Sequence, residues 1–77
     1  MISFELKGNA FDKPGEELEV FLDRQGLESL IAQLRMLSSG STDHVHLMSR
    51  SWGGAHLEDV PRAAANKAVH HVKISMT

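Results

Sequence analysis

Cysteine is absent from the 77-residue sequence, which excludes both a disulfide framework and a zinc site built from thiolates. A small domain without cysteine suits the reducing cytoplasm, and we expect a cytoplasmic protein. The N-terminal segment has no basic run followed by an apolar block, so we expect no signal peptide. No stretch approaches the roughly 20 apolar residues of a transmembrane helix, so we expect no association with a membrane.

The net charge is small, but the charged residues are unevenly distributed. The net charge of −2 offers no basic surface for nucleic acid, and we expect no nucleic-acid partner. Residues 1–43 carry eight acids and four bases (−4), whereas residues 44–77 carry two acids, four bases (+2) and all five histidines. An acidic face built from the first part could attract a basic partner, or it could be ordinary solvated surface.

The first part of the chain predicts two strands. Residues 2–7 alternate apolar Ile2, Phe4 and Leu6 with polar residues, which is typical of a strand with one solvated face. The Asp-Lys-Pro-Gly sequence at 12–15 predicts a turn. Residues 17–22 alternate again and predict the second strand.

A helix is predicted from Asp23 onward. The Asp23 carboxylate can accept hydrogen bonds from the first free N–H groups of a helix. Gly40 is a plausible C-terminal cap. Between them one apolar stripe repeats with the 3.6-residue period of a helix, and it comprises Leu27, Leu30, Ile31, Leu34 and Leu37.

The last part of the chain predicts two further strands, at residues 44–49 and 68–76, with loops at 51–54 and 58–67. In the third strand Val45 and Leu47 share one face. The opposite face carries His44, His46 and Met48. In the fourth strand Ala68, His70, Val72, Ile74 and Met76 share one face, and Val69, His71, Lys73 and Ser75 share the other.

These elements predict one α+β domain over residues 1–77, in the order strand, strand, helix, strand, strand. We expect a mainly antiparallel four-stranded sheet with the helix on one face. The helix is then expected to pack against Phe4, Val20, Val45, Leu47, Val72 and Ile74. The other face would carry Glu5, Glu19, Phe21, His44, His46, Met48, His71 and Lys73, with no chain left to cover it.

The histidines admit a metal site as one hypothesis. His44 and His46 point the same way from one strand, and His71 could join them from a neighbouring strand, leaving a fourth position open. This spacing is necessary but not sufficient, so we predict no bound metal or cofactor and keep a histidine metal site as the alternative.

Enzymatic signatures are incomplete. The alternating histidines stop at Met48, where a histidine-triad pattern would need a third histidine. Gly53-Gly54 lacks the Lys-Ser/Thr of a phosphate loop. Ser49 and Ser51 do not lie in a G-x-S-x-G elbow. We therefore predict a protein without catalytic residues.

A protein-binding surface is the third hypothesis. Tryptophan, methionine, arginine and histidine supply anchoring contact area, and Trp52 lies beside two glycines that let another backbone approach closely. Alternatively, Trp52 folds back to close the end of a small core. For His70, on the predicted apolar face, a hydrogen-bonded core position is the simpler interpretation.

Several segments together resemble the immunity protein 32 family of bacterial polymorphic toxin systems. They are Gly26-Leu-Glu-Ser-Leu30, His44-Val-His-Leu-Met48, Trp52-Gly-Gly54 with Leu57, and Val69-His-His-Val-Lys-Ile74. The resemblance covers roughly residues 17–76. It departs from the family in a longer charged lead-in at 7–16 and in an alanine-rich stretch at 59–67.

The resemblance implies a small cytoplasmic protein, encoded beside a toxin, that binds the cognate bacterial toxin domain and occludes it without catalysis. An acidic stripe would speed association with a basic toxin. A homodimer is the other way to cover the free sheet face. The expected contact residues are His44, His46, Met48, Arg50, Trp52, His71 and Lys73. Clustered histidines would repel one another when protonated, so mild acid should weaken binding or stability.

Overall fold

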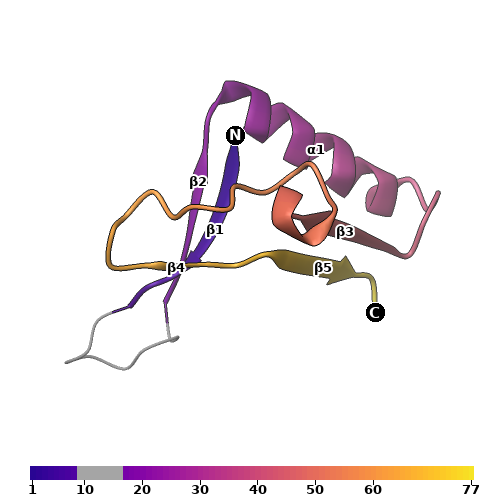
Figure 1. The fold of residues 1–77 in the computed structure, drawn as a ribbon. Helices are drawn as coiled ribbons and strands as arrows, with labels where there is room; N and C mark the ends of the chain where they lie inside the picture. The colour runs from indigo at the N-terminus through magenta and orange to yellow at the C-terminus, as the bar shows by residue number, and fades with distance from the viewer. Residues whose placement is uncertain (9–16) are drawn as a thin grey trace.

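The chain folds into one α-helix and two antiparallel sheets over residues 1–8 and 17–77, which are the residues that this computed structural model describes (Figure 1). The turn predicted at residues 12–15 lies outside them. The elements are β1 (Ile2–Leu6), β2 (Leu18–Leu22), α1 (Arg24–Ser38), β3 (His44–Met48), the 3-10 helix η1 (Arg50–Trp52), β4 (Lys67–Ala68) and β5 (His71–Ser75).

The α+β class is confirmed, but the single four-stranded sheet is wrong. One sheet has the order β2-β1-β4, and the other consists of β3 and β5. The segment predicted as one strand over 68–76 is divided at Val69 and His70. The Val69 N–H donates to Phe4 O (2.8 Å), whereas the His70 carbonyl accepts from the Ser49 N–H (2.9 Å). The chain therefore leaves β1 and joins β3 at this point.

The predicted N-cap of the helix is confirmed, and its C-cap lies one residue before the predicted position. The Asp23 carboxylate accepts a hydrogen bond from the Gly26 N–H at 2.7 Å, as expected of an N-cap. At the other end Ser39 is the C-cap residue and Gly40 follows it with a φ of 78°, a left-handed conformation that glycine adopts without strain. No helix in the described ranges has the length and apolar character needed to cross a membrane.

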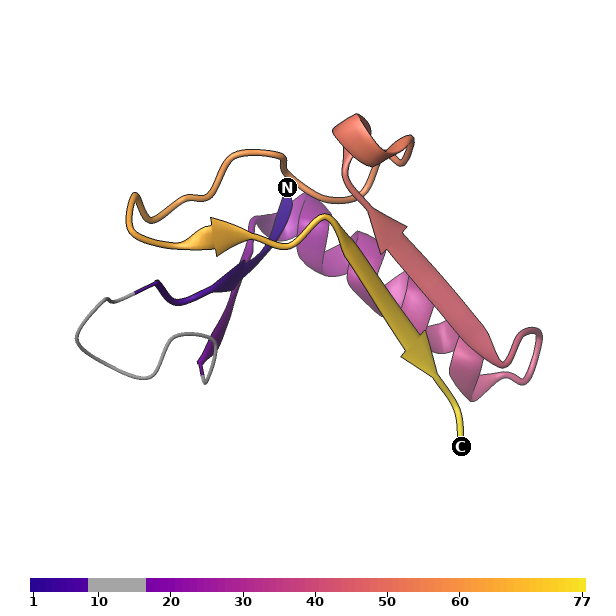
Figure 2. The same ribbon diagram turned by 60° about the horizontal axis from the view of Figure 1, so that its bottom comes forward.

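The helix covers one face of the β3–β5 ribbon, behind which it runs in Figure 2. Val45 and Leu47 point inward from β3 and are buried. A core cluster of buried residues continues from there toward β1, and it comprises Ile2, Phe4, Leu47 and Leu57. The ribbon and β1 thus share one apolar core.

Val20 was expected in this core and is 43% exposed, so that prediction is wrong. In Figure 1, β2 leads into α1 and its beginning lies far from the helix, so only its last residue, Leu22, packs against the core cluster. Because the strands form two sheets instead of one, a 15-residue helix cannot cover all of them. The far part of β2 therefore stays exposed, with Leu18 at 52%.

The face of β1 that was expected to be solvated is buried. Ser3 and Glu5 have no exposed surface, because the loop between η1 and β4 folds over them. The Glu5 carboxylate accepts hydrogen bonds from the Arg62 N–H (2.7 Å), the Ala63 N–H (3.3 Å), Asn66 Nδ2 (3.0 Å) and the Ser3 hydroxyl. Glu5 therefore does not belong to an uncovered sheet face.

Burial alone would raise the pKa of Glu5, but the hydrogen bonds from the loop and from Ser3 outweigh burial. They lower the pKa of Glu5 from 4.5 to about 2. Glu19, expected on the same open face, is partly buried and accepts a hydrogen bond from Asn66 Nδ2 at 3.1 Å. These carboxylates hold the loop against the three-stranded sheet and are not free to form an acidic binding face.

Candidate functional site

The outer face of the β3–β5 ribbon carries the predicted cluster of large polar side chains. The register pairs His46 with Lys73, Met48 with His71, and His44 with Ser75. The three histidines and Lys73 are exposed, and Met48 is partly exposed. Figure 2 shows the helix on the opposite side of the ribbon and no described segment over this face. We call it the histidine face, comprising His44, His46, Met48, His71 and Lys73.

The imidazoles of the histidine face contact one another. His46 Nδ1 and His71 Nε2 are 2.8 Å apart, and the two rings stack with centroids 5.0 Å apart. The His44 ring meets that of His46 edge-on at 5.1 Å, and His44 Nδ1 lies 2.6 Å from Asp43 Oδ1. A hydrogen bond between two imidazole nitrogens requires that one of them be unprotonated. His46 and His71 therefore keep their contact only while at least one is neutral.

The expected clustering of His44, His46 and His71 is thus confirmed as geometry. In the described part of the chain, no group of three or more histidine, aspartate or glutamate side chains is arranged to hold a metal ion. Desolvation, followed by the nearby charges of His44, His71 and Lys73, lowers the pKa of His46 below 6.5. This cluster favours the neutral form of its central histidine.

The free energy of unfolding should fall as the pH drops from 8 to 5.5. The pKa of His46 is lower in the folded chain than its ordinary value of 6.5, so the unfolded chain binds the proton more readily. The stability that His46 contributes is present above pH 6.5 and is lost as the pH falls toward its folded-state pKa. Urea unfolding at several pH values measures this loss.

His46→Gln should reduce the dependence of the free energy of unfolding on pH. His56→Gln removes a histidine outside the histidine face and should leave most of that dependence in place. An equal free energy of unfolding for the wild type at pH 8 and pH 5.5 would contradict the proposed effect of His46 protonation on stability.

Trp52 lies at the end of the ribbon, on a short 3-10 helix that follows β3. Gly53 ends this helix with a φ of 87°. A side chain at Gly54 would meet the Met48 carbonyl oxygen at 2.4 Å, so the loop returns against β3 only with glycine there. Trp52 is 57% exposed and stacks on the His70 ring, with the ring planes 2° apart. The alternative in which Trp52 closes a core is therefore wrong.

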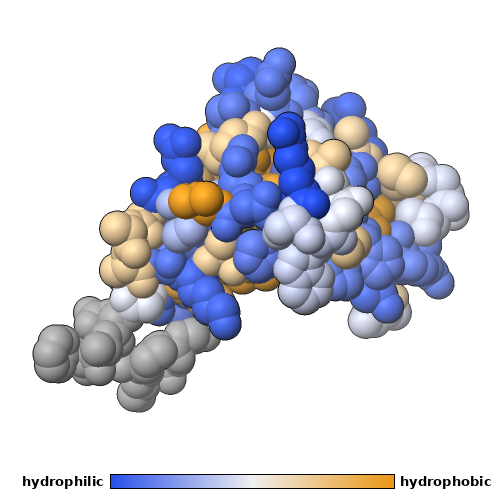
Figure 3. Space-filling model, viewed as in Figure 1, coloured by the Kyte–Doolittle hydropathy of each residue, from blue (hydrophilic) through white to orange (hydrophobic). Residues whose placement is uncertain are grey.

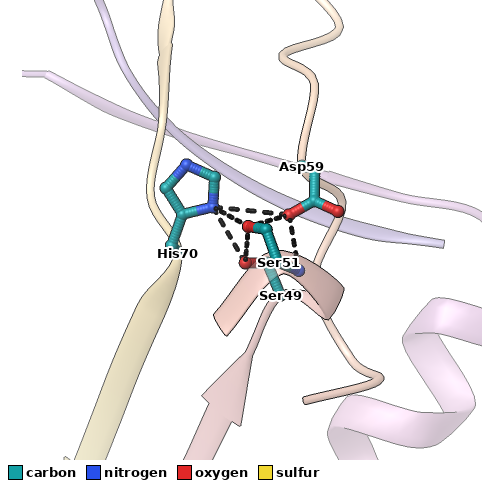
Figure 4. Close-up of polar contacts among 4 residues, drawn as sticks. All are labelled: Ser49, Ser51, Asp59 and His70. Carbon is teal, nitrogen blue, oxygen red and sulfur yellow. Dashed lines mark hydrogen bonds and ion pairs between the residues drawn. The ribbon is translucent and has the colours of Figure 1, made fainter. Parts of the chain in front are cut away.

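A polar cluster beneath Trp52 joins three separate segments of the chain (Figure 4). His70 Nδ1 lies 2.8 Å from Ser49 Oγ, and Ser49 Oγ lies 3.1 Å from Ser51 Oγ. The Asp59 carboxylate accepts hydrogen bonds from both the hydroxyl and the N–H of Ser51, and these bonds lower the pKa of Asp59. The cluster fastens the Trp52 loop both to the junction before β5 and to the loop that covers Glu5.

This cluster contains serine, histidine and aspartate but lacks the geometry of a nucleophilic triad. In a triad the carboxylate binds one imidazole nitrogen and the hydroxyl faces the other. Here Ser49, Ser51 (3.4 Å) and Asp59 (3.6 Å) all approach Nδ1 of His70. Ser49 also has no exposed surface. The arrangement is suited to holding the loop in place.

The expected contact residues thus divide into two groups. Five of them form the histidine face, while Arg50 and Trp52 lie on η1 at the Met48 end of β3 and are exposed. No local pattern indicates that Asp59 and His70 meet Ser51, because they are 8 and 19 residues away from it along the chain. His70 is hydrogen-bonded as expected, but the break before β5 removes it from the apolar face of the strand.

The side of the molecule drawn in Figure 3 has few strongly hydrophobic features, whereas the exposed large hydrophobic residues include Leu18 and Val20 on β2 and Leu34 and Met36 on α1. Figure 3 shows a largely hydrophilic side of the molecule, with one isolated hydrophobic group over the loop between η1 and β4. Val60, 74% exposed, is the most exposed large hydrophobic residue among those described in this loop. A single exposed valine does not make a binding patch.

Comparison with known proteins identifies one family. The sequence profile of the family Immunity protein 32 matches residues 17–72, from the start of β2 to the middle of β5. No curated protein and no solved structure gives a significant match. The matched range includes the Trp52 loop, the polar cluster around His70 and most of the histidine face, and it spans more than half of the 77 residues. The chain therefore belongs to the Immunity protein 32 family.

Proposed function

We propose that this protein is a cytoplasmic immunity protein that binds one cognate toxin domain of a bacterial polymorphic toxin system and neutralises it by occlusion. Membership of an immunity protein family supports the class of function. The polar cluster around His70 supports a role without catalysis, since its serines and aspartate share one imidazole nitrogen. The protein acts stoichiometrically, so its benefit to the cell depends on affinity.

The proposed contact surface is the histidine face together with Arg50 and Trp52. The observation that carries this assignment is that the histidine face is well populated with large side chains and yet lies uncovered on the side of the ribbon away from α1. Tight complexes bury about 1,600 Å² and depend on a few anchors, commonly tryptophan or arginine. Trp52 is held by its stacking on His70, so it loses little conformational freedom on binding.

The test is co-expression with the toxin domain that we expect to be encoded beside this gene. We expect the wild type to protect the cells and to co-purify with the toxin domain. The double variant His46→Ala/Trp52→Ala should raise the Kd by about thirtyfold or more, since two anchors each contribute over about 1 kcal/mol. The matched control is Gln25→Ala/Met36→Ala, which removes two exposed side chains from α1.

Circular dichroism establishes that each variant is folded before binding is measured. A folded His46→Ala/Trp52→Ala variant that protects as well as the wild type would contradict the proposed surface. A wild type that neither binds the toxin domain nor protects the cells would contradict the proposed function itself.

A further inference from the structure

The outer edge of β5 presents unpaired backbone groups. In an antiparallel pair, hydrogen-bonded and non-hydrogen-bonded residue pairs alternate along the strands. The bonds Ser49 N–H to His70 O and Met76 N–H to Asp43 O mark the hydrogen-bonded pairs at the two ends of the ribbon. The pairs that include His71, Lys73 and Ser75 are then the non-hydrogen-bonded ones. The N–H and C=O groups of these three residues point away from β3.

The corresponding edge of β3 is hydrogen-bonded within the chain at its two ends. The Met48 carbonyl accepts hydrogen bonds from the N–H groups of His56 and Leu57, and the His44 carbonyl accepts one from the Thr42 hydroxyl. On β5, by contrast, the outward groups bond to no residue that the structure describes. In Figures 1 and 2 none of the described elements runs alongside β5 on the side away from β3. The edge of β5 is therefore open for pairing along its whole length.

We propose that an extended strand of the toxin pairs with the open edge of β5, and that this strand alternates acidic with apolar residues. This inference rests on the proposed function and specifies how the toxin docks. Strand addition at an exposed sheet edge is an established mode of recognition in which main-chain bonds give affinity and alternate side chains give specificity.

The charges beside the edge select the acidic residues of the incoming strand. Side chains of the incoming strand that face the same way as His71 and Lys73 would lie next to them. The sequences of β3 and β5 contain no acidic residue. A carboxylate opposite Lys73 would form an ion pair there.

The opposite side chains of the incoming strand would meet the apolar side of β5. Val72 and Ile74 pack against the core cluster but are only partly buried. Apolar residues at alternate positions of the toxin strand would complete their burial. One face of the incoming strand would thus be complementary to the positive charge of Lys73, and the other would extend the apolar core.

A second copy of this chain fits the same edge poorly. Two β5 strands pairing about a twofold axis through their full length would bring Lys73 opposite Lys73 of the other copy. Like charges directly opposite each other destabilise a strand pair, and lysine in edge strands commonly opposes self-pairing. The charge of the edge therefore favours a different, acidic strand.

The test compares Lys73→Pro with Lys73→Ala in binding to the toxin domain encoded beside the gene. Both variants remove the lysine charge, but only proline removes the outward N–H, and the ladder to β3 keeps all its bonds. We expect the Kd of Lys73→Pro for the toxin domain to be at least about tenfold higher than that of Lys73→Ala. Equal affinities of the two folded variants would overturn the proposal.

Amide hydrogen exchange of the wild type tests the same point without a substitution. In the complex, the amides of His71, Lys73 and Ser75 should exchange at least about tenfold more slowly than in the free protein, and unchanged exchange in a formed complex would overturn the proposal. Sedimentation that reveals a dimer of this chain, dissociated by Lys73→Pro, would also overturn it by assigning the edge to a second copy. If the wild type does not bind the toxin domain, the proposed function itself fails.

Discussion

Glu5→Gln is expected to lower the free energy of unfolding by about 3 kcal/mol, a large part of the stability of so small a domain. Glu5 has no exposed surface, and its two carboxylate oxygens accept hydrogen bonds from four donors. Glutamine keeps the shape but replaces one acceptor oxygen with an NH₂ group. That group would face the donors of the loop, leaving buried N–H groups without acceptors.

The pKa of Glu5 supports the same magnitude. It is about 2 in the folded chain against an ordinary value of 4.5, which corresponds to about 3 kcal/mol at neutral pH. Because the folded-state pKa is lowered, this contribution is present above pH 4.5 and is lost as the pH falls toward 2. The acid limb of the wild-type stability profile should therefore be steep in this range and weaker in Glu5→Gln.

Urea unfolding at pH 7 measures the effect, and Glu17→Gln is the matched control. Glu17 is an exposed carboxylate that pairs with Lys7 at 3.4 Å, and its replacement should change the free energy of unfolding by less than about 0.5 kcal/mol. Trypsin offers a second measurement, since release of the loop should speed cleavage after Arg62. Equal urea midpoints for the wild type and Glu5→Gln would rule out the anchoring role.

Local patterns in the sequence were sufficient for the elements that define the proposed contact surface. Strand alternation placed His44, His46 and Met48 on one face because successive side chains point to opposite faces, whichever sheet the strand joins. The helix was predictable for a similar reason. The capping bond of Asp23 reaches a residue only three positions later in the chain, and the apolar stripe repeats within one element.

Long-range pairing could not be read from the same patterns. The alternation of residues 68–76 is compatible with one strand, and only the partners on either side, Phe4 for Val69 and Ser49 for His70, divide it between two sheets. Glu5 looked solvated because the loop that buries it comes 57 residues later and carries no periodic signal. Val20 was misplaced as a consequence, since one helix was expected to cover one larger sheet.

The loop that buries Glu5 also positions the proposed contact surface. Its backbone binds Glu5 at Arg62 and Ala63, and its Asp59 binds Ser51 beside Trp52. A buried carboxylate on the three-stranded sheet is thereby connected to an exposed tryptophan at the end of the ribbon. Loss of the anchor at Glu5 should therefore loosen the Trp52 loop even under conditions where the domain remains folded.

Gly26→Ala is expected to destabilise the fold by about 3 kcal/mol, at or beyond the usual cost of overpacking. Helix propensity alone predicts the opposite sign, because alanine is better than glycine in a helix by about 1 kcal/mol. The structure reverses this expectation. A Cβ atom at Gly26 would lie 1.8 Å from the Met1 carbonyl oxygen and 3.1 Å from the Ile2 side chain.

The start of β1 cannot easily move to make room for that methyl group. The Met1 carbonyl accepts a hydrogen bond from the Asp23 N–H at 3.2 Å, and Ile2 is only 2% exposed in the core cluster. Relief of the clash would have to break that bond or pull Ile2 out of the core. Gly26 is therefore required by the close approach of β1 to the first turn of α1.

Urea unfolding again provides the measurement, with Ala32→Gly as the control for propensity. Ala32 is exposed near the middle of α1, so its replacement should cost only the propensity difference of about 1 kcal/mol. The two substitutions exchange the same pair of residues in opposite directions on one helix. If packing of β1 against the helix decides the outcome, both must destabilise. If propensity decides it, Gly26→Ala must unfold at a higher urea concentration than the wild type, which would contradict the close approach.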